Sequence, residues 1–453
     1  MSNHFMKTKP VFPLLMSMSI PMMFSMLIQS LYNIIDSIYV AQLGQTALTA
    51  VSIAFPLQNL VISVAVGIGV GITSTISIYL GSGQQEKANK AATLGIACTC
   101  IHCIVFLLFG LIVTKPFLSL FTNSSEILAN ACNYTYIVLC FSFGTLIQVT
   151  MEKIFQAVGA MKTTMFLLAT GCIINIILDP IFIFGWFQVP ALGVKGAAIA
   201  TIIAQICTAI LYIIVYRKKN FAVIIHPKYL KIDLTIIKSI YSVGIPSSLM
   251  MILPSILVSI LNSILKQFSD LYINVLGIYF KLQTFIYMPA NGIVQGMRPI
   301  IGYNYGAKDY NRMKSTIRYS LLSAGIIMLL GTLLSMIIPR EIFMLFQSDP
   351  SLLSAGSTAL RIISLGFLVS TIGIIFSGTF EAIGKGKESL TISLLRQFIL
   401  TIPLSLILSR IPSIGVNGVW ISFPIGELCA SIVAYFLLKK QENGALSPFS
   451  LKK

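Results

Sequence analysis

The stretch IQSLYNIIDSIYVAQLGQ, residues 28–45, is apolar along most of its length and contains one charged residue, Asp36. It belongs to an apolar run that is long enough to cross a bilayer core of about 30 Å as a helix. Similar runs recur throughout the 453-residue chain, which is 56% hydrophobic and only 10% charged. Soluble proteins carry about 25% charged residues. The sequence therefore predicts an all-α polytopic membrane protein.

The apolar runs predict twelve transmembrane spans, and an even number places both termini on one side. The loops on that side carry most of the 31 Lys and Arg residues, so the positive-inside rule predicts cytoplasmic termini in the cell membrane. The net charge of +17 is thus an orientation signal, and we expect no nucleic-acid partner. The spans are expected near residues 12–41, 51–80, 91–114, 130–152, 163–186, 193–216, 236–265, 271–304, 316–338, 353–380, 388–410 and 415–438.

The two halves of the sequence match when one is shifted by 225 residues. The matching positions include glycines, prolines and loop lysines, which chance similarity between apolar segments would not align. After a slip to 222, GVKGAAI from Gly193 matches GVNGVWI from Gly415. The pairs at a shift of 225 include Pro21/Pro246, Gln58/Gln283, Gly67/Gly292, Gly71/Gly296, Gly81/Gly306, Phe155/Phe380, Gly159/Gly384 and Lys162/Lys387.

This duplication predicts two six-helix bundles, related as parallel repeats by a pseudo-two-fold axis along the membrane normal. We expect the first bundle at residues 1–219, a cytoplasmic linker at 220–235, the second bundle at 236–440 and a cytoplasmic tail at 441–453. Proteins built this way are commonly carriers that rock their halves around a central site. The architecture therefore favours a carrier over a receptor, a channel or a membrane enzyme.

Two carboxylates lie inside spans of the first half, and intramembrane acids are by default candidates for function. Asp36 and Asp179 are each six or seven residues from the outer end of a span, so their depths agree. Asn33 and Asn175 share a helix face with Asp36 and Asp179, respectively. Thr201 reaches the same level from the sixth span.

Carboxylate, amide and hydroxyl oxygens at one depth could hold Na⁺, with Asp36, Asn175 and Asp179 as ligands. They could equally share a proton, because two carboxylates that are close together in a medium of low dielectric do not both stay charged. An interhelical clamp of protonated acids is the alternative without a coupling role. The coupling site is favoured because two acids exceed what such a clamp needs.

Several motifs together resemble the multidrug and toxic compound extrusion (MATE) transporters. The resemblance rests on two six-span halves, NIIDSIYVAQLG (33–44), NIILDPIFIF (175–184) and GMRPIIGYNYGAKDYNR (296–312). It implies a secondary antiporter that exports amphipathic, cationic drugs in exchange for H⁺ or Na⁺ through a central cleft. It also implies that Asp36, Asn175 and Asp179 form the coupling site, and Thr201 is a weaker match.

The sequence departs from those MATE branches that carry acidic ligands in the second bundle, since spans seven and eight contain no Asp or Glu. Coupling is therefore expected to rest on the first half. We expect no cofactor and no ATP, since no Walker motif occurs, and a monomer in the lipid bilayer. The principal alternative is a lipid-linked precursor flippase of a related two-bundle fold.

Other polar or adaptable residues are candidates for the substrate cleft: Glu152, Lys281, Gln58, Gln283, Gln148 and Met288. Glu152 could contact a cationic substrate or pair with Lys153. Lys281 lies near mid-membrane, so we expect it to face the cleft or to have a partner. Arg298 and Arg396 are expected to reach lipid phosphates at the inner surface.

The cluster CTCIHC (98–103) resembles a metal site only superficially. Its cysteines point in different directions on one helix, and no second Cys/His group completes the coordination. We expect the eight cysteines to be ordinary small apolar residues and the chain not to be an enzyme.

Overall fold

The computed structural model describes residues 4–346 and 349–444, and every regular element within these ranges is a helix. Helices are what a chain of this composition must form in lipid, because each one satisfies its own backbone hydrogen bonds. The all-α prediction is confirmed. The predicted tail comprises residues 441–453, and its residues after 444 lie outside the described residues.

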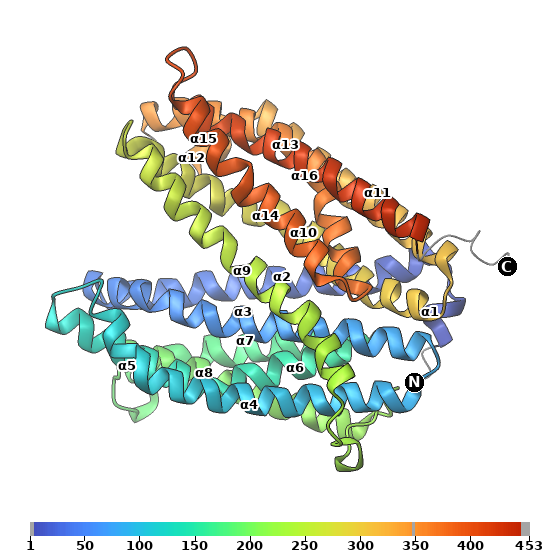
Figure 1. The fold of residues 1–453 in the computed structure, drawn as a ribbon. Helices are drawn as coiled ribbons and strands as arrows, with labels where there is room; N and C mark the ends of the chain where they lie inside the picture. Colours follow the sequence, from blue (N-terminus) through green and yellow to red (C-terminus); the bar gives the residue numbers. More distant parts are fainter. Residues whose placement is uncertain (1–3, 347–348, 445–453) are drawn as a thin grey trace. The chain divides into compact units, whose positions relative to one another are not determined.

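The helices form two compact units. The N-terminal unit comprises Met1–Thr8 and Phe24–Ser248, and the C-terminal unit comprises Lys9–Met23 and Leu249–Lys453. Two 32-residue helices, α2 (Val11–Gln42) and α9 (Leu234–Leu265), therefore each contribute to both units. In Figure 1 the helices from α3 to α8 form one bundle and those from α10 to α16 another.

The remaining elements of the N-terminal unit are α1 (His4–Thr8), α3 (Gln45–Gly81), α4 (Gln85–Leu118), α5 (Ser125–Cys140), α6 (Phe143–Ala157), α7 (Met161–Phe184), η1 (Trp186–Gln188), α8 (Val194–Lys218) and η2 (Pro227–Tyr229). Those of the C-terminal unit are α10 (Asp270–Gly306), α11 (Tyr310–Ile337), α12 (Pro339–Met344), α13 (Pro350–Ala382), α14 (Gly386–Leu394), the π-helix η3 (Leu395–Ile399), α15 (Thr401–Ser409) and α16 (Asn417–Gly444).

The division into units crosses the boundaries expected from the sequence at two places. Residues 9–23 pack with the C-terminal unit, and residues 236–248 pack with the N-terminal unit. Repeat-related glycines make room for these half-helices. A Cβ on Gly71 of α3 would lie 2.1 Å from the Ile240 carbonyl oxygen, and one on Gly296 of α10 would lie 2.7 Å from Ser19 Cα. The half-helices are thus held by close backbone contact.

The duplication also appears in the backbone conformation. Positive φ angles occur at repeat-related positions, namely Gly83 (73°) and Lys308 (58°), Gly159 (78°) and Gly384 (82°), and Gly193 (53°) and Gly415 (55°). The same turns therefore recur in both halves, even where glycine is replaced by lysine.

Ten helices in the described ranges are long and apolar enough to cross a membrane, and α5 with α6 forms an eleventh candidate that is bent by 45°. The helix α10, at the position of the expected eighth span, is not among them. It is 37 residues long and carries Lys281 and Arg298. Twelve spans remain a prediction that requires α10 to cross as well.

Candidate functional site

The two acids singled out in the sequence meet inside the N-terminal unit. The carboxyl groups of Asp36 on α2 and Asp179 on α7 lie within hydrogen-bonding reach of each other. Asp179 is fully buried, and Oδ1 of the partly buried Asp36 has no hydrogen-bond donor among the described residues. Two carboxylates can form a hydrogen bond only when one of them holds a proton. A proton, or a cation in its place, therefore stabilises the arrangement.

Asn175 connects these acids to one further helix, α8. When its amide oxygen accepts from the Thr201 backbone N–H (3.1 Å), its nitrogen donates to the Tyr32 hydroxyl (3.3 Å) and to Asp179 Oδ2 (3.2 Å). This orientation satisfies both ends of the amide. Tyr32 also hydrogen-bonds the Thr201 side chain. The acids thus belong to a network that joins α2, α7 and α8.

The local sequence of α7 leaves one backbone carbonyl without its usual helical donor. The helix continues through Pro180, which has no N–H to donate to the carbonyl of Ile176. That carbonyl lies one turn before Asp179, on the same helix. It adds one oxygen to those that a proton or Na⁺ could use.

Not every predicted residue joins the site. Thr201 does, with only 4% of its surface exposed. Asn33 lies on an exposed part of α2, and no hydrogen bond links its side chain to Asp36 among the described residues. The three-residue spacing indicated that Asn33 and Asp36 share a helix face. It did not indicate whether the Asn33 side chain faces the interior of the protein or its surface. Tyr32 was not predicted, although its spacing of four residues from Asp36 is a signal that could have found it.

A cavity of ≈ 80 Å³ opens directly beside the acids within the same unit. It shares Tyr32, Asn175 and Thr201 with the acidic network, and it is also lined by Gln148, a predicted cleft residue. Several of the remaining lining residues can donate or accept hydrogen bonds. The other lining residues are Gln29, Leu168, Gly171, Cys172, Ala204, Gln205 and Thr208.

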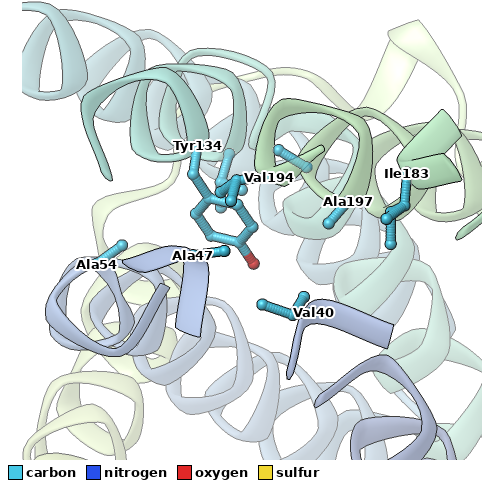
Figure 2. Close-up of a cluster of buried hydrophobic side chains, with 9 residues drawn as sticks. Val40, Ala47, Ala54, Tyr134, Ile183, Val194 and Ala197 are labelled. Atoms are coloured by element: carbon cyan, nitrogen blue, oxygen red, sulfur yellow. The ribbon is translucent and has the colours of Figure 1, made fainter. Parts of the chain in front are cut away.

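An apolar cluster covers the acids toward the C-terminal ends of α2 and α7. Val40 and Ile183 follow Asp36 and Asp179 by four residues, so they lie one turn further along the same faces. Figure 2 shows them with Tyr134, whose ring extends from α5 into this cluster. The Tyr134 hydroxyl donates to Gln58 at 3.2 Å. The cluster adds buried apolar side chains one turn beyond the acids.

The other predicted cleft residues are dispersed. Glu152 is engaged by Lys153 Nζ at 3.2 Å and by Gln156 Nε2 at 2.7 Å, so the structure shows the pairing alternative. Gln283 hydrogen-bonds Tyr287, and Met288 is buried; both belong to the C-terminal unit.

Lys281 lies on α10 and is exposed. It has no ion pair or hydrogen bond within residues 4–346 and 349–444, so the partner allowed for it in the sequence is not found there.

Two arginines have partners that the sequence did not predict. Arg298 pairs with Glu381, and Arg396 Nε lies 3.4 Å from Glu427 Oε1. The expectation that both arginines reach lipid phosphates is not supported, because each pairs with a buried carboxylate within the protein. Glu427 itself was missed, although a Glu within an apolar run is the same signal that identified Asp36.

The eight cysteines are unpaired thiols, and among the described residues no group of three His, Cys, Asp or Glu could hold a metal ion. The sequence CTCIHC thus forms no metal centre in this part of the chain.

The chain is similar to known proteins along nearly its whole length. A family model described as MatE matches residues 21–181 and 246–407. These two matches begin 225 residues apart, which is the shift inferred for the internal repeat. Multidrug export proteins MepA from Staphylococcus aureus (strain bovine RF122 / ET3-1) and Staphylococcus haemolyticus (strain JCSC1435) are 27% and 26% identical, over 96% of this chain and 96% and 94% of theirs.

Solved structures agree with this fold. An outward-facing multidrug resistance MATE family transporter of the MOP superfamily has a TM-score of 0.90 and 25% identity, over 98% of both chains. A MOP superfamily transporter from Pyrococcus furiosus, described as having a binding pocket of reversed polarity, has a TM-score of 0.91 at the same identity and coverage.

Proposed function

The chain belongs to the MATE family of multi-pass membrane transporters, and on that premise we propose that it exports amphipathic, cationic organic compounds in exchange for H⁺ or Na⁺. The family consists of ion-coupled antiporters rather than enzymes. Export of drugs is what the staphylococcal relatives are named for. The coupling ion and the chemical class of the substrate are the parts that experiment has to establish.

One observation supports the proposal: three residues of the acidic network also line the cavity. Tyr32, Asn175 and Thr201 hydrogen-bond within the acidic network and also line the cavity. A proton or Na⁺ that binds between Asp36 and Asp179 changes which oxygens are available to Asn175. The same residues then present different donors to a ligand in the cavity. Ion and drug binding are thereby linked, as exchange requires.

The size of the cavity indicates that binding a drug involves movement. Sites for drug-sized molecules are about 300–1,000 Å³, whereas this cavity measures ≈ 80 Å³. The cavity lies among α2, α6, α7 and α8, and α2 is divided between the two units. Displacement of α2 is the change that would both widen the cavity and separate Asp36 from Asp179.

The test is drug transport into proteoliposomes under pH and sodium gradients that are imposed separately. Asp36→Asn and Asp179→Asn should each lower ion-driven transport by at least about tenfold, because an amide cannot carry a proton and ligates Na⁺ weakly. Asp349→Asn is the matched control, since Asp349 is an exposed helix cap and Asn also caps well. It should transport as the wild type does.

Two outcomes would overturn the proposal. Wild-type rates in both Asp variants would remove the acids from coupling. Scrambling of lipid-linked precursors by the wild type, without ion-driven drug transport, would favour the flippase alternative. The ion whose gradient drives transport identifies the coupling ion.

A further inference from the structure

The C-terminal unit contains a buried charge pair that the proposed mechanism does not use. Arg396 lies on η3 and Glu427 on α16, with 3.4 Å between Nε and Oε1. Only 9% of Glu427 is exposed. The single long contact is weaker than the two parallel hydrogen bonds that Arg and a carboxylate form in a well-made pair.

The second carboxylate oxygen of Glu427 is unsatisfied. Oε2 is buried and has no hydrogen-bond partner among the described residues. The Tyr287 hydroxyl does not supply one, since it donates to Ser370 Oγ at 3.0 Å. A buried ion pair offsets its desolvation only when its remaining lone pairs are hydrogen-bonded. This pair is therefore a poor structural clamp.

The backbone around Arg396 is irregular in a way that fixes the pair in place. Residues Leu395–Ile399 form a π-helix, and the Thr401 hydroxyl donates to the Arg396 carbonyl. A Cβ on Gly426 would lie 2.6 Å from Thr401 Oγ1 and 3.2 Å from that carbonyl, so α16 approaches closely just before Glu427. Single π-turns inside α-helices are frequent at functional sites.

The internal repeat relates this pair to the cavity of the other unit. The helix α7 and the segment Gly386–Ser409 have equal length and are offset by 225 at both ends, which aligns Arg396 with Gly171. The offset of 222 after that segment aligns Glu427 with Gln205. Both Gly171 and Gln205 line the cavity beside the acidic network. The C-terminal unit therefore has an Arg and a Glu at the positions that line the cavity in the N-terminal unit.

The charged and titratable groups that face Glu427 restrict what it can bind. Arg396 faces it from η3, and Tyr279 and Tyr287 face it from α10. The helix α13 approaches Glu427 at Gly366, which has no charged side chain. The adjacent guanidinium repels a metal cation that would have only one carboxylate as ligand. A proton needs no further ligands and neutralises the unsatisfied oxygen.

We propose that Glu427 is a proton-carrying site of the C-terminal unit, separate from the acids of the N-terminal unit. A proton from water binds Oε2, and Arg396 keeps its charge and loses an anionic partner. Release of the proton restores the pair. This inference deepens the proposed function, because it assigns part of the ion exchange to the second repeat.

The experiment follows carboxyl protonation directly, in purified transporter without drug, by infrared difference spectroscopy between acidic and alkaline pH. Glu427→Gln should remove one protonated-carboxyl component. Glu427→Asp should restore a component at a shifted frequency, which also shows that the site folds. Glu341→Gln is the control, since Glu341 is exposed; it should leave the component that Glu427→Gln removes unchanged.

A second readout counts the protons that exchange per drug molecule in proteoliposomes. Glu427→Gln should lower that number by one, whereas the Asp36 and Asp179 variants abolish coupling. A spectrum of Glu427→Gln identical to that of the wild type would overturn the proton site. Because the infrared measurement requires no transport, it tests the proton site at Glu427 independently of the proposed function.

Discussion

Because the carboxyls of Asp36 and Asp179 lie within hydrogen-bonding reach, a proton or a cation between them stabilises this arrangement. Two unit charges 4 Å apart repel by about 4 kcal/mol at an effective dielectric of 20. That is enough to change the ratio of two conformations by about a thousandfold. An emptied site therefore favours a conformation in which α2 and α7 hold their acids apart.

Removing the Tyr32 hydroxyl should weaken the ion site without abolishing it. In Tyr32→Phe, Asn175 loses one acceptor and Thr201 one partner. A lost hydrogen bond costs about 0.5–1.5 kcal/mol, so the half-saturating ion concentration should rise by roughly two- to twelvefold. The measurement is drug transport against the concentration of the driving ion.

Tyr39→Phe is the control for this change. Tyr39 lies about two turns further along α2, and its ring packs against Phe184 at 6.2 Å between centroids. An unchanged ion dependence in Tyr39→Phe and a shifted one in Tyr32→Phe are expected. Equal shifts in both would mean that the Tyr32 hydroxyl has no specific role.

Part of the candidate site was predictable from single helices. An acid inside an apolar run is conspicuous, and equal depth correctly paired Asp36 with Asp179. The side of α2 that faces inward was not predictable, so Asn33 was included and Tyr32 missed. The Arg396–Glu427 pair was missed because it depends on two helices whose contact the spacing within either helix does not reveal.

At the scale of elements, glycine pairs explain how half-helices of α2 and α9 pack so tightly. A Cβ at Gly67 would lie 2.4 Å from the Ser248 backbone nitrogen, and one at Gly292 would lie 2.9 Å from Met23 Cα. Close helix packing is what a stripe of small residues such as GIGVG (67–71) favours. The partners, however, were not predictable, because a stripe of small residues does not specify which helix fills it.

The contact at Gly296 predicts a destabilised variant. In Gly296→Ala, the new methyl group would lie 2.7 Å from the Ser19 backbone. Overpacking of this kind costs about 1–3 kcal/mol, so the thermal unfolding midpoint in detergent should fall by a few degrees. Differential scanning fluorimetry measures it.

Gly277→Ala provides the comparison on the same helix. No atom lies within 4 Å of its added methyl group, and the gain in helix propensity is the same. Its midpoint should stay level or rise slightly. A fall of equal size in both variants would show that the α2 contact is not the cause.

At the scale of the molecule, the repeat and the helical class were predictable because both are recorded in composition and spacing. The division of α2 and α9 between units was not. The polar linker at 220–235 indicated a boundary along the chain, whereas the units are defined by packing. The described turns nevertheless recur at the positions that the repeat predicts.

The orientation in the membrane can be tested with single cysteines in a background without native cysteines. Asn123 and Lys231 are exposed and lie in loops expected on opposite sides. Asn123→Cys should react with a membrane-impermeant maleimide in intact cells, and Lys231→Cys only after permeabilisation. The opposite pattern would place the termini outside.

The sharing of α2 and α9 has a consequence for biosynthesis. Residues 9–23 leave the ribosome early, yet the glycines that receive them belong to α10 and are made more than 250 residues later. The N-terminal unit, in turn, stays incomplete until residue 248 has been translated. Residues 9–23 must therefore stay in the bilayer without their packing partner until α10 has been made, exposed to lipids and to insertion chaperones. A nascent chain that is stalled before α10 lacks the packing partner of residues 9–23.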